Sequence, residues 1–286
     1  MKIIKYFLEF ISVISLFCIF KIIGLKNASK LGSIIGQIFG PLFRSKNIKT
    51  GLGEISLEQE KKIINGMWSN IGRTFAEYIY LKDFRFNKTN FNHIKINGVK
   101  YLDEIKNSNR SAIFYSGHFA NFELMAMELD KYGIKCAAIY RPLNNFFLNP
   151  LMEYLRMKYI CPNQIPKGRI GMREIVSKVK NGYSIALMVD QRVGEGPREI
   201  FFNKPAHTTT IPAQLALKFN CKLVPISLER KSDVEFEMTI YKPYEIIKTY
   251  NDKEDTRNIT RKINQNLEKM ILKNPTQWIW SHNRWK

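Results

Sequence analysis

The sequence predicts an α/β fold in which a mixed, largely parallel central sheet is flanked by helices, with an N-terminal membrane-anchor helix before it. Two observations predict this fold: β-rich runs alternate with helical patterns from about residue 90 onward, and the first 25 residues are almost entirely apolar. Strands are expected at 111–116, 136–140, 184–189 and 222–228. Helices are expected at 119–131, 149–158, 170–179, 211–219 and 256–272. No repeat or low-complexity linker divides the chain further, so we expect an anchor at 1–25 and one folded domain at 26–286.

The N-terminal segment has three possible roles: a spanning helix, an interfacial helix in one leaflet, or a cleaved signal peptide. Its uncharged stretch, Phe10 to Phe20, is shorter than the roughly 20 residues of a clean span, although Lys5 and Lys21 can extend their charges to the interface. A signal peptide is disfavoured because no small-x-small cleavage site directly follows the apolar run. The basic residues after the run place the main body on the cytoplasmic side; they are Lys21, Lys26, Lys30, Arg44, Lys46 and Lys49.

Two helical features follow the anchor. Gly32, Gly36 and Gly40 are each four residues apart, a spacing that permits close helix packing but also occurs in glycine-rich loops. A long helix is expected after Ser56, which is a suitable N-cap, and the apolar residues between Ile64 and Tyr78 recur at helical spacing. We expect that apolar stripe to face the core.

The composition restricts the partners. The 45 lysine and arginine residues outnumber the 25 aspartates and glutamates, and the net charge of +20 favours anionic partners: nucleic acid, acidic lipid headgroups or an acidic carrier protein. The four cysteines are far apart in sequence, which favours free thiols in a reducing compartment. Only four histidines are present, at scattered positions, so we expect neither a metal nor a cofactor.

The strongest catalytic candidate is His118, which follows the expected strand 111–116 through Gly117. Catalytic groups in open α/β sheets gather at the carboxyl ends of strands. Glu123 is five positions further on, and two helical residues at that spacing would be roughly 140° apart around the axis. We therefore expect His118 in a loop and Glu123 on the following helix.

In that arrangement the Glu123 carboxylate accepts a hydrogen bond from one imidazole nitrogen and leaves the other free to take a proton. His118 would then be a general base, and the free amides of the helix N-terminus would stabilise a developing oxyanion. This chemistry suits the attack of a hydroxyl on a thioester. The spacing alone is equally compatible with a structural histidine at a strand end.

Other substrate-binding candidates lie elsewhere in the chain. Arg141 follows the expected strand 136–140 and suits a clamp on a phosphate or on the Glu123 carboxylate; the alternative is an ordinary surface arginine. Asp190 and Gln191 begin a glycine-containing loop that suits an anionic group, or that is a plain turn. The terminal tryptophans near Arg284 would face the membrane or a carrier, or would pack the last helix. Asn121, within the His118 segment, is also a candidate.

Five ordered motifs carry a family resemblance that runs along the whole chain. They are residues 116–124 (SGHFANFEL), 140–145 (YRPLNN), 190–196 (DQRVGEG), 201–206 (FFNKPA) and 274–285 (NPTQWIWSHNRW). In these motifs the sequence resembles the lipid A biosynthesis acyltransferases, the late or lauroyl/myristoyl acyltransferases of lipopolysaccharide assembly. Glu123 does not assign an acyl length, and the basic Arg192 departs from the variety that the family shows at that position.

The resemblance implies a fold like that of glycerol-phosphate acyltransferases, with His118 and Glu123 as the catalytic dyad and Arg141 near them. It implies that acyl carrier protein delivers the acyl chain as a thioester. The acceptor would be a hydroxyl on a hydroxyacyl chain of a phosphorylated glucosamine disaccharide lipid. The enzyme would lie at the bacterial inner membrane, with its catalytic domain (26–286) on the cytoplasmic face.

Two rival functions remain at this stage. One is an acyltransferase of the same broad superfamily that acts on glycerol phosphate or a glycosylated phospholipid; the terminal 274–285 motif favours the lipid A branch over it. The other is a membrane-associated nucleic-acid-binding protein, which the charge suggests. The basic residues are spread along the chain without a recognisable binding motif, so we expect no nucleic-acid partner.

Overall fold

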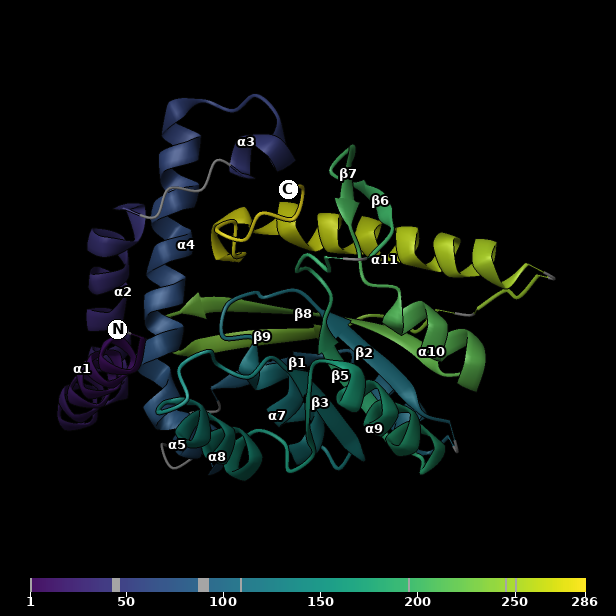
Figure 1. Ribbon diagram of the computed structural model, residues 1–286, viewed down its shortest axis with the longest axis horizontal. Helices are drawn as coiled ribbons and strands as arrows, with labels where there is room; N and C mark the ends of the chain where they lie inside the picture. The colour runs from purple at the N-terminus through teal and green to yellow at the C-terminus, as the bar shows by residue number, and fades with distance from the viewer. Residues whose placement is uncertain are drawn as a thin grey trace.

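The computed structural model describes residues 2–42, 47–86, 93–108, 110–194, 196–244, 246–249 and 251–286 (Figure 1). Two of the basic residues that follow the anchor, Arg44 and Lys46, lie outside the described residues, as does Glu195 of the 190–196 motif. The helices are α1 Lys2–Ile23, α2 Leu25–Phe39, α3 Asn47–Leu52, α4 Leu57–Glu77, α5 Leu81–Phe86, α6 Val99–Lys106, α7 Glu123–Lys131, α8 Asn149–Tyr159, α9 Arg169–Lys180, α10 Ile211–Phe219 and α11 Asp252–Lys273. Short 3-10 helices are η1 Gly40–Leu42, η2 Tyr78–Tyr80 and η3 Pro275–Gln277.

The main sheet confirms the predicted mixed, largely parallel architecture. Its strands are β1 Ile94–Asn97, β2 Ala112–Ser116, β3 Cys136–Tyr140, β4 Gln164–Pro166, β5 Ser184–Met188, β8 Lys222–Ser232 and β9 Glu235–Ile240. Their order is β1-β9-β8-β2-β5-β3-β4, and among the described residues only the β8–β9 pair of this sheet is antiparallel. A separate antiparallel hairpin joins β6 Arg198–Phe201 to β7 Lys204–His207.

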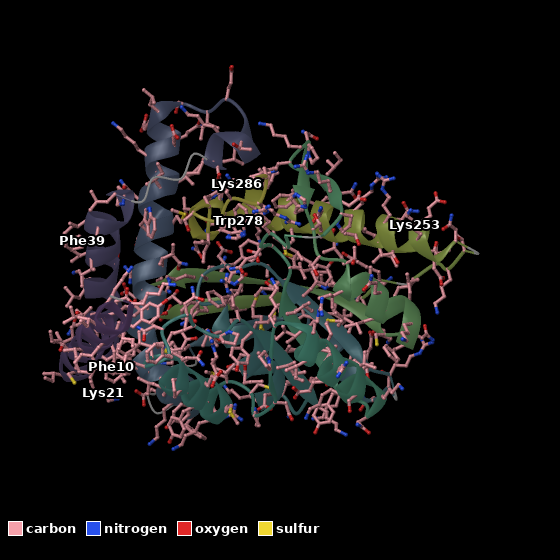
Figure 2. The ribbon with its side chains drawn as sticks, viewed as in Figure 1. Phe10, Lys21, Phe39, Lys253, Trp278 and Lys286 are labelled. Atoms are coloured by element: carbon pink, nitrogen blue, oxygen red, sulfur yellow. The ribbon has the colours of Figure 1, made fainter. Side chains whose placement is uncertain are left out.

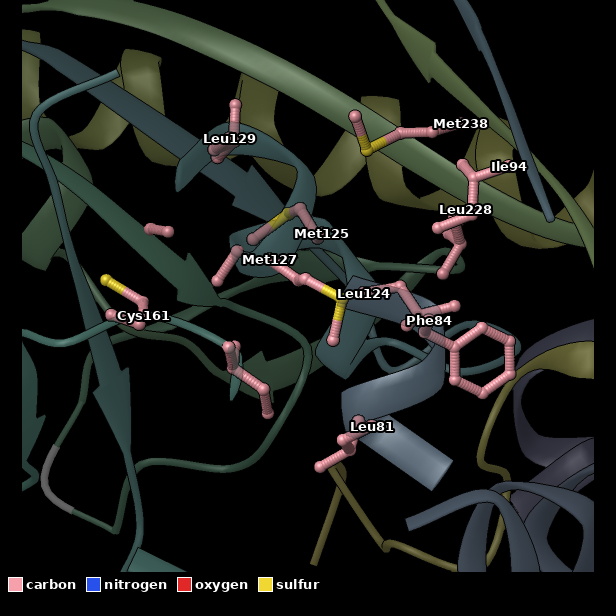
Figure 3. Packing of buried hydrophobic residues seen from close by; sticks show 14 of the residues in the cluster. Leu81, Phe84, Ile94, Leu124, Met125, Met127, Leu129, Cys161, Leu228 and Met238 are labelled. Carbon is pink, nitrogen blue, oxygen red and sulfur yellow. The ribbon is translucent and has the colours of Figure 1, made fainter. Parts of the chain in front are cut away.

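Both faces of the sheet are covered, which explains why its central strand β2 is buried throughout. Successive residues of β2 point to opposite faces. Ala112 and Phe114 belong to one hydrophobic core, whereas Ile113 and Tyr115 belong to a second. The first core contains α5 and α7, and Figure 3 shows Leu124, Met125 and Met127 of α7 packed among its side chains. The second core contains apolar residues of α10 and α11.

Helix α1 has the length and apolar composition of a candidate membrane span. Much of its apolar surface is exposed, including Ile4, Phe7 and Leu8. Near its C-terminal end, Phe17 and Phe20 pack against Phe75 of α4, and nearer its N-terminal end Phe7 contacts Phe147. Figure 1 shows α1 and α2 beside α4, to one side of the sheet, and Figure 2 marks Phe10 and Lys21 in this region.

The glycine spacing after the anchor marks a close helix contact between α2 and α4. A Cβ atom on Gly32 would come within 2.3 Å of the Gly72 carbonyl oxygen, and one on Gly36 within 2.1 Å of the Trp68 carbonyl oxygen. Only glycine allows the two backbones to approach this closely. Helix α4 begins after Ser56, which is the N-cap as expected, and Ser56 and Gln59 form a capping box in which the side chain of each bonds the other's backbone amide.

Candidate active site

His118 and Asp190 are brought together by the register of two neighbouring parallel strands. Ser116 at the end of β2 pairs with Met188 at the end of β5, and each candidate residue follows its strand by two positions. Asp190 Oδ1 accepts a 2.7 Å hydrogen bond from His118 Nδ1. Asp190 Oδ2 accepts a second 2.7 Å bond from the backbone amide of His118. His118 lies in the loop before α7, as the sequence predicts.

Asp190 is buried and held in its ionised form. Burial alone would raise its pKa, but the charge of His118 and the hydrogen bonds from His118 outweigh burial and lower the Asp190 pKa to about 2. The indole Nε1 of Trp278 donates a further 2.8 Å bond to Asp190 Oδ2. A carboxylate with three donors in a buried setting is a fixed acceptor for the imidazole.

The same contact raises the pKa of His118 and sets the tautomer of its neutral ring. Burial would lower its pKa, but the Asp190 charge and hydrogen bond, with a smaller contribution from Glu123, raise the His118 pKa above its ordinary value. Because the Nδ1 proton is donated to Asp190, the neutral ring carries its lone pair on Nε2. Gln191 Nε2 lies 3.3 Å from His118 Nε2. The Phe122 ring packs edge-on against the imidazole, with the two ring centroids 4.6 Å apart. His118 therefore has the form of a general base.

The sequence predicts a direct hydrogen bond between Glu123 and His118, and this prediction is wrong, because each of the two side chains bonds another partner. Glu123 is the first residue of α7, as predicted, but its Oε1 accepts from Arg156 Nη2 at 2.6 Å and Nε at 3.1 Å, and from the Tyr78 hydroxyl. Arg156 projects from α8, and its guanidinium lies 5.8 Å from the ring centroid of Tyr78 and 5.5 Å from that of Tyr140. The buried Glu123 carboxylate is paired with the Arg156 guanidinium of α8. The carboxylate that accepts from His118 Nδ1 is Asp190 instead.

A buried polar network fixes the loop that carries His118. Ala120 has a φ of 46°, its carbonyl oxygen accepts from Asn70 and Thr74, and its amide donates to the Gln277 carbonyl. Below this loop Glu77, which is fully buried, forms a bidentate pair with Arg230 at 2.6 and 3.0 Å. These bonds offset the strain of the left-handed backbone at Ala120.

A cavity of about 520 Å³ opens beside His118 and Glu123. Much of its buried lining is apolar and comes from α7, β3 and β5: Met125, Ala126, Ala138, Ala186 and Leu187. Its exposed lining includes Arg141, Leu143, Asn144 and Lys167. The cavity thus joins an apolar interior to a charged rim, and His118 is part of its lining.

Not all predicted site residues reach this cavity. Arg141 and Gln191 line it. Asn121 does not: it is buried, and its Nδ2 donates 2.9 Å to Glu77 Oε2. Arg284 does not either, because it lies inside the second core over the Phe201 ring and donates to Asn264 at 2.7 Å. Burial lowers the Arg284 pKa to about 10. Both residues are packing and bracing groups in this structure.

Several site residues were not identified from the sequence. Arg156 lies in a helix with one other basic residue, Lys158, and no local pattern distinguishes it. His282, in the terminal motif, also lines the cavity, and its Nε2 accepts a 2.8 Å bond from the Arg192 amide. Burial lowers its pKa, which favours the neutral ring, and because Nε2 accepts this bond the proton of that ring lies on Nδ1. Trp278 and Trp280 are buried, which decides between the two roles considered for them in favour of packing.

The fold places a hydrogen-bonded histidine–carboxylate pair next to a cavity with a largely apolar lining, an arrangement that suits an enzyme acting on an apolar substrate. All residues of the chain, 1–286, match the model of the bacterial lipid A biosynthesis acyltransferases, and the chain belongs to this family. It is therefore an acyltransferase of lipid A biosynthesis.

Named relatives agree with this family membership. The chain is 25% identical over 272 residues to the lipid A biosynthesis palmitoleoyltransferase of Escherichia coli K12, covering 90% of this chain and 84% of the relative. It is 24% identical over 248 residues to the lauroyltransferase of the same strain, covering 84% and 77%. A Haemophilus influenzae lipid A biosynthesis acyltransferase is 28% identical over 200 residues, covering 67% and 60%.

Proposed function

We propose that this enzyme transfers a fatty acyl chain from an acyl carrier protein thioester to a hydroxyl on a hydroxyacyl chain of a lipid A precursor. His118 is the general base, and no acyl-enzyme forms. The observation that carries this mechanism is the 2.7 Å bond from His118 Nδ1 to the buried Asp190, which places the lone pair of the neutral imidazole on Nε2, with His118 in the cavity lining. The family membership supports the acceptor class.

The reaction follows from this protonation state. The acceptor hydroxyl gives its proton to His118 Nε2 as its oxygen attacks the thioester carbonyl carbon. The tetrahedral intermediate then collapses, the carbon–sulfur bond breaks, and the proton passes from His118 to the departing thiolate. The imidazolium formed between these steps is stabilised by the Asp190 carboxylate, which remains ionised.

Glu123 retains a place in the proposed site, but through its charge and its partners. It lines the cavity with His118, and its carboxylate contributes to the raised His118 pKa. Its bonds to Arg156 and Tyr78 fix the start of α7 against α8. In the proposal Glu123 therefore supports the imidazolium, while Asp190 sets the tautomer.

The apolar interior of the cavity suits the acyl chain of the donor. Buried methionine, leucine and alanine side chains form this interior, and a cavity of about 520 Å³ is within the usual size range of small-molecule sites. Burying methylene groups there contributes about 0.8 kcal/mol each. The donor thioester would then present its carbonyl to the side of the cavity where His118 lies.

The location completes the proposal. Residues 1–25 are the membrane anchor, and residues 26–286 form the catalytic domain on the cytoplasmic face of the bacterial inner membrane. The exposed apolar residues of α1 support membrane attachment, and the excess of basic residues after α1 supports the orientation. The net charge of +20 favours both an acidic carrier protein and an anionic lipid.

The test is a transfer assay with purified full-length enzyme and an acyl carrier protein thioester. Three acceptors are compared: the phosphorylated disaccharide lipid with hydroxyacyl chains, the same lipid with those hydroxyls absent, and glycerol phosphate. We expect mass spectrometry to show one added acyl chain on the first acceptor alone. Acylation of glycerol phosphate in preference to the disaccharide lipid would overturn the proposed acceptor. A second set of reactions contains a coenzyme A thioester in place of the carrier protein thioester. Acyl transfer from the coenzyme A thioester, without transfer from the carrier protein thioester, would overturn the proposed donor.

A further inference from the structure

Two cations leave adjacent strands side by side at the rim of the cavity. Tyr140 at the end of β3 pairs with Pro166 at the end of β4, and the Lys167 amide donates 2.8 Å to the Tyr140 carbonyl. The next residues, Arg141 and Lys167, therefore emerge from the same edge of the sheet. Both line the cavity, and both are exposed. The register of β3 and β4 thus places two positive charges next to each other at the rim of the cavity.

The cavity lacks carboxylates to match this pair. Its charged lining residues are Arg141, Arg156, Lys167 and Glu123, and Glu123 is already paired with Arg156. Within the described parts of the chain, no carboxylate lies within 4 Å of Arg141 or Lys167. Burial and the neighbouring Arg141 charge lower the Lys167 pKa. Two adjacent cations without a counter-ion, in a recess with a low-dielectric wall, attract an anionic ligand.

The loop that begins with Arg141 is attached to the candidate membrane helix. Asn145 Nδ2 donates 2.9 Å to the Tyr6 carbonyl of α1 and 3.0 Å to Glu9 Oε2. Phe146 packs on Tyr6 with ring centroids 5.7 Å apart. Arg141 precedes Asn145 by four residues, so its backbone lies within about 14 Å of this contact.

The exposed surface around this contact is apolar. Phe7 of α1 and Phe146 of the loop are both about half exposed, at 48% and 51%, and Leu143 is 39% exposed. These side chains are continuous with the apolar surface of α1 through the Phe7–Phe147 and Phe146–Phe147 ring contacts. If α1 is embedded in the membrane, a cation pair at this distance from it lies within reach of lipid phosphates.

We propose that Arg141 and Lys167 form a phosphate-binding site for the lipid acceptor. Arg141 supplies a planar fork of donors and Lys167 a compact charge, a combination that suits a phosphate monoester. The phosphodiester in the arm of a carrier protein has related chemistry, but the attachment of the Arg141 loop to α1 favours the lipid. This inference rests on the proposed function, and it specifies which part of the acceptor the rim binds.

The experiment measures KM for each substrate with the full-length enzyme and its Arg141→Ala, Lys167→Ala and Lys180→Ala variants. Lys180 is the matched control, since it is an exposed lysine at the C-terminal end of α9, outside the cavity lining. Each enzyme receives the disaccharide lipid with its phosphates and the same lipid after enzymatic removal of its phosphates. The donor is an acyl carrier protein thioester throughout.

We expect Arg141→Ala and Lys167→Ala each to raise KM for the phosphorylated acceptor by about tenfold or more, the value of a charge-assisted hydrogen bond. Their kcat, their KM for the donor and their KM for the dephosphorylated acceptor should stay within about threefold of wild type. Wild type itself should lose affinity when the phosphates are removed. Lys180→Ala should match wild type on every substrate.

Two results would overturn the inference. An equal rise in KM for both acceptors would show that the cations do not bind the phosphate. A rise in KM for the donor alone would assign the cations to the carrier arm.

A parallel measurement separates this question from catalysis: sedimentation of each enzyme with phosphatidylcholine vesicles containing either acceptor. Phosphate-dependent binding that the two alanine variants lose would support the site even if no acyl transfer occurred, in which case the proposed function alone would fail.

Discussion

Asp190 accepts two hydrogen bonds of 2.7 Å from His118, one from the ring Nδ1 and one from the backbone amide. This paired contact fixes both the tautomer of the imidazole and the position of its backbone. It arises because β2 and β5 are neighbouring parallel strands that end in register. The general-base account of the site depends on it.

The first prediction concerns Asp190→Asn. An asparagine amide that turns its NH₂ toward Nδ1 favours the tautomer with the proton on Nε2, which blocks the base. By comparison with the aspartate of serine-protease triads, we expect kcat to fall by about 10³ to 10⁴. Steady-state kinetics of the purified variant, with circular dichroism as the control for folding, make the measurement. A kcat within threefold of wild type would contradict the role assigned to Asp190.

The second prediction concerns the pH profile of kcat/KM. A general base works when it is deprotonated, so activity rises as pH increases through the His118 pKa. That pKa is raised, so the acid limb should lie above the ordinary histidine value of about 6.5. In Glu123→Gln the limb should move to lower pH, because the Glu123 charge is lost while the Arg156 charge remains. A limb that stays in place, or moves upward, would show that Glu123 does not act on His118.

The third prediction concerns stability against pH. The His118 pKa is raised by folding, so its contribution to stability is present below its unfolded value and lost as pH rises through the folded value. The Asp190 pKa is lowered to about 2, so its contribution is present above its unfolded value and lost as pH falls toward 2. The thermal midpoints of wild type and Asp190→Asn should therefore differ most between about pH 4 and 6.5. A difference that grows steadily above pH 7 would be incompatible with this ion pair.

The fourth prediction concerns the buried pair of Arg156 and Glu123. Arg156→Met leaves a carboxylate that is 10% exposed without its cation, and should lower the free energy of unfolding by about 3 to 5 kcal/mol. The double variant Glu123→Gln, Arg156→Met removes the stranded charge and should recover part of that loss. Denaturant unfolding of the two variants and wild type measures both effects. If the double variant were less stable than Arg156→Met, charge burial would not be the cause.

Local sequence patterns predicted the parts of the fold that depend on local chemistry. The β3 strand and the α10 helix have the expected bounds, and the Ser56 cap begins α4. Helix α7 starts four residues later than expected, at Glu123, because Ala120 is held at a φ of 46° by bonds to distant segments. The short edge strands β1 and β4 have too few residues for a periodic pattern.

The site was only partly predictable for the same reason. His118 in a loop and Glu123 on a helix follow from spacing within one segment. The bond to Asp190 joins residues 72 positions apart, and the bond between Arg156 and Glu123 joins residues 33 positions apart. These contacts depend on strand order and helix placement, which one sequence does not specify. Asn121 and Arg284 lie in motifs near the site, yet their side chains turn to Glu77 and to the second core.

The most direct test of the central claim is the mass of the lipid acceptor after incubation with acyl carrier protein thioester and either wild-type enzyme or His118→Ala. The account predicts one added acyl chain with wild type. With His118→Ala it predicts a loss of at least about 10³-fold in the rate of that addition, with thermal stability sufficient for the assay. Addition of the acyl chain by His118→Ala at a rate near that of wild type would contradict the account.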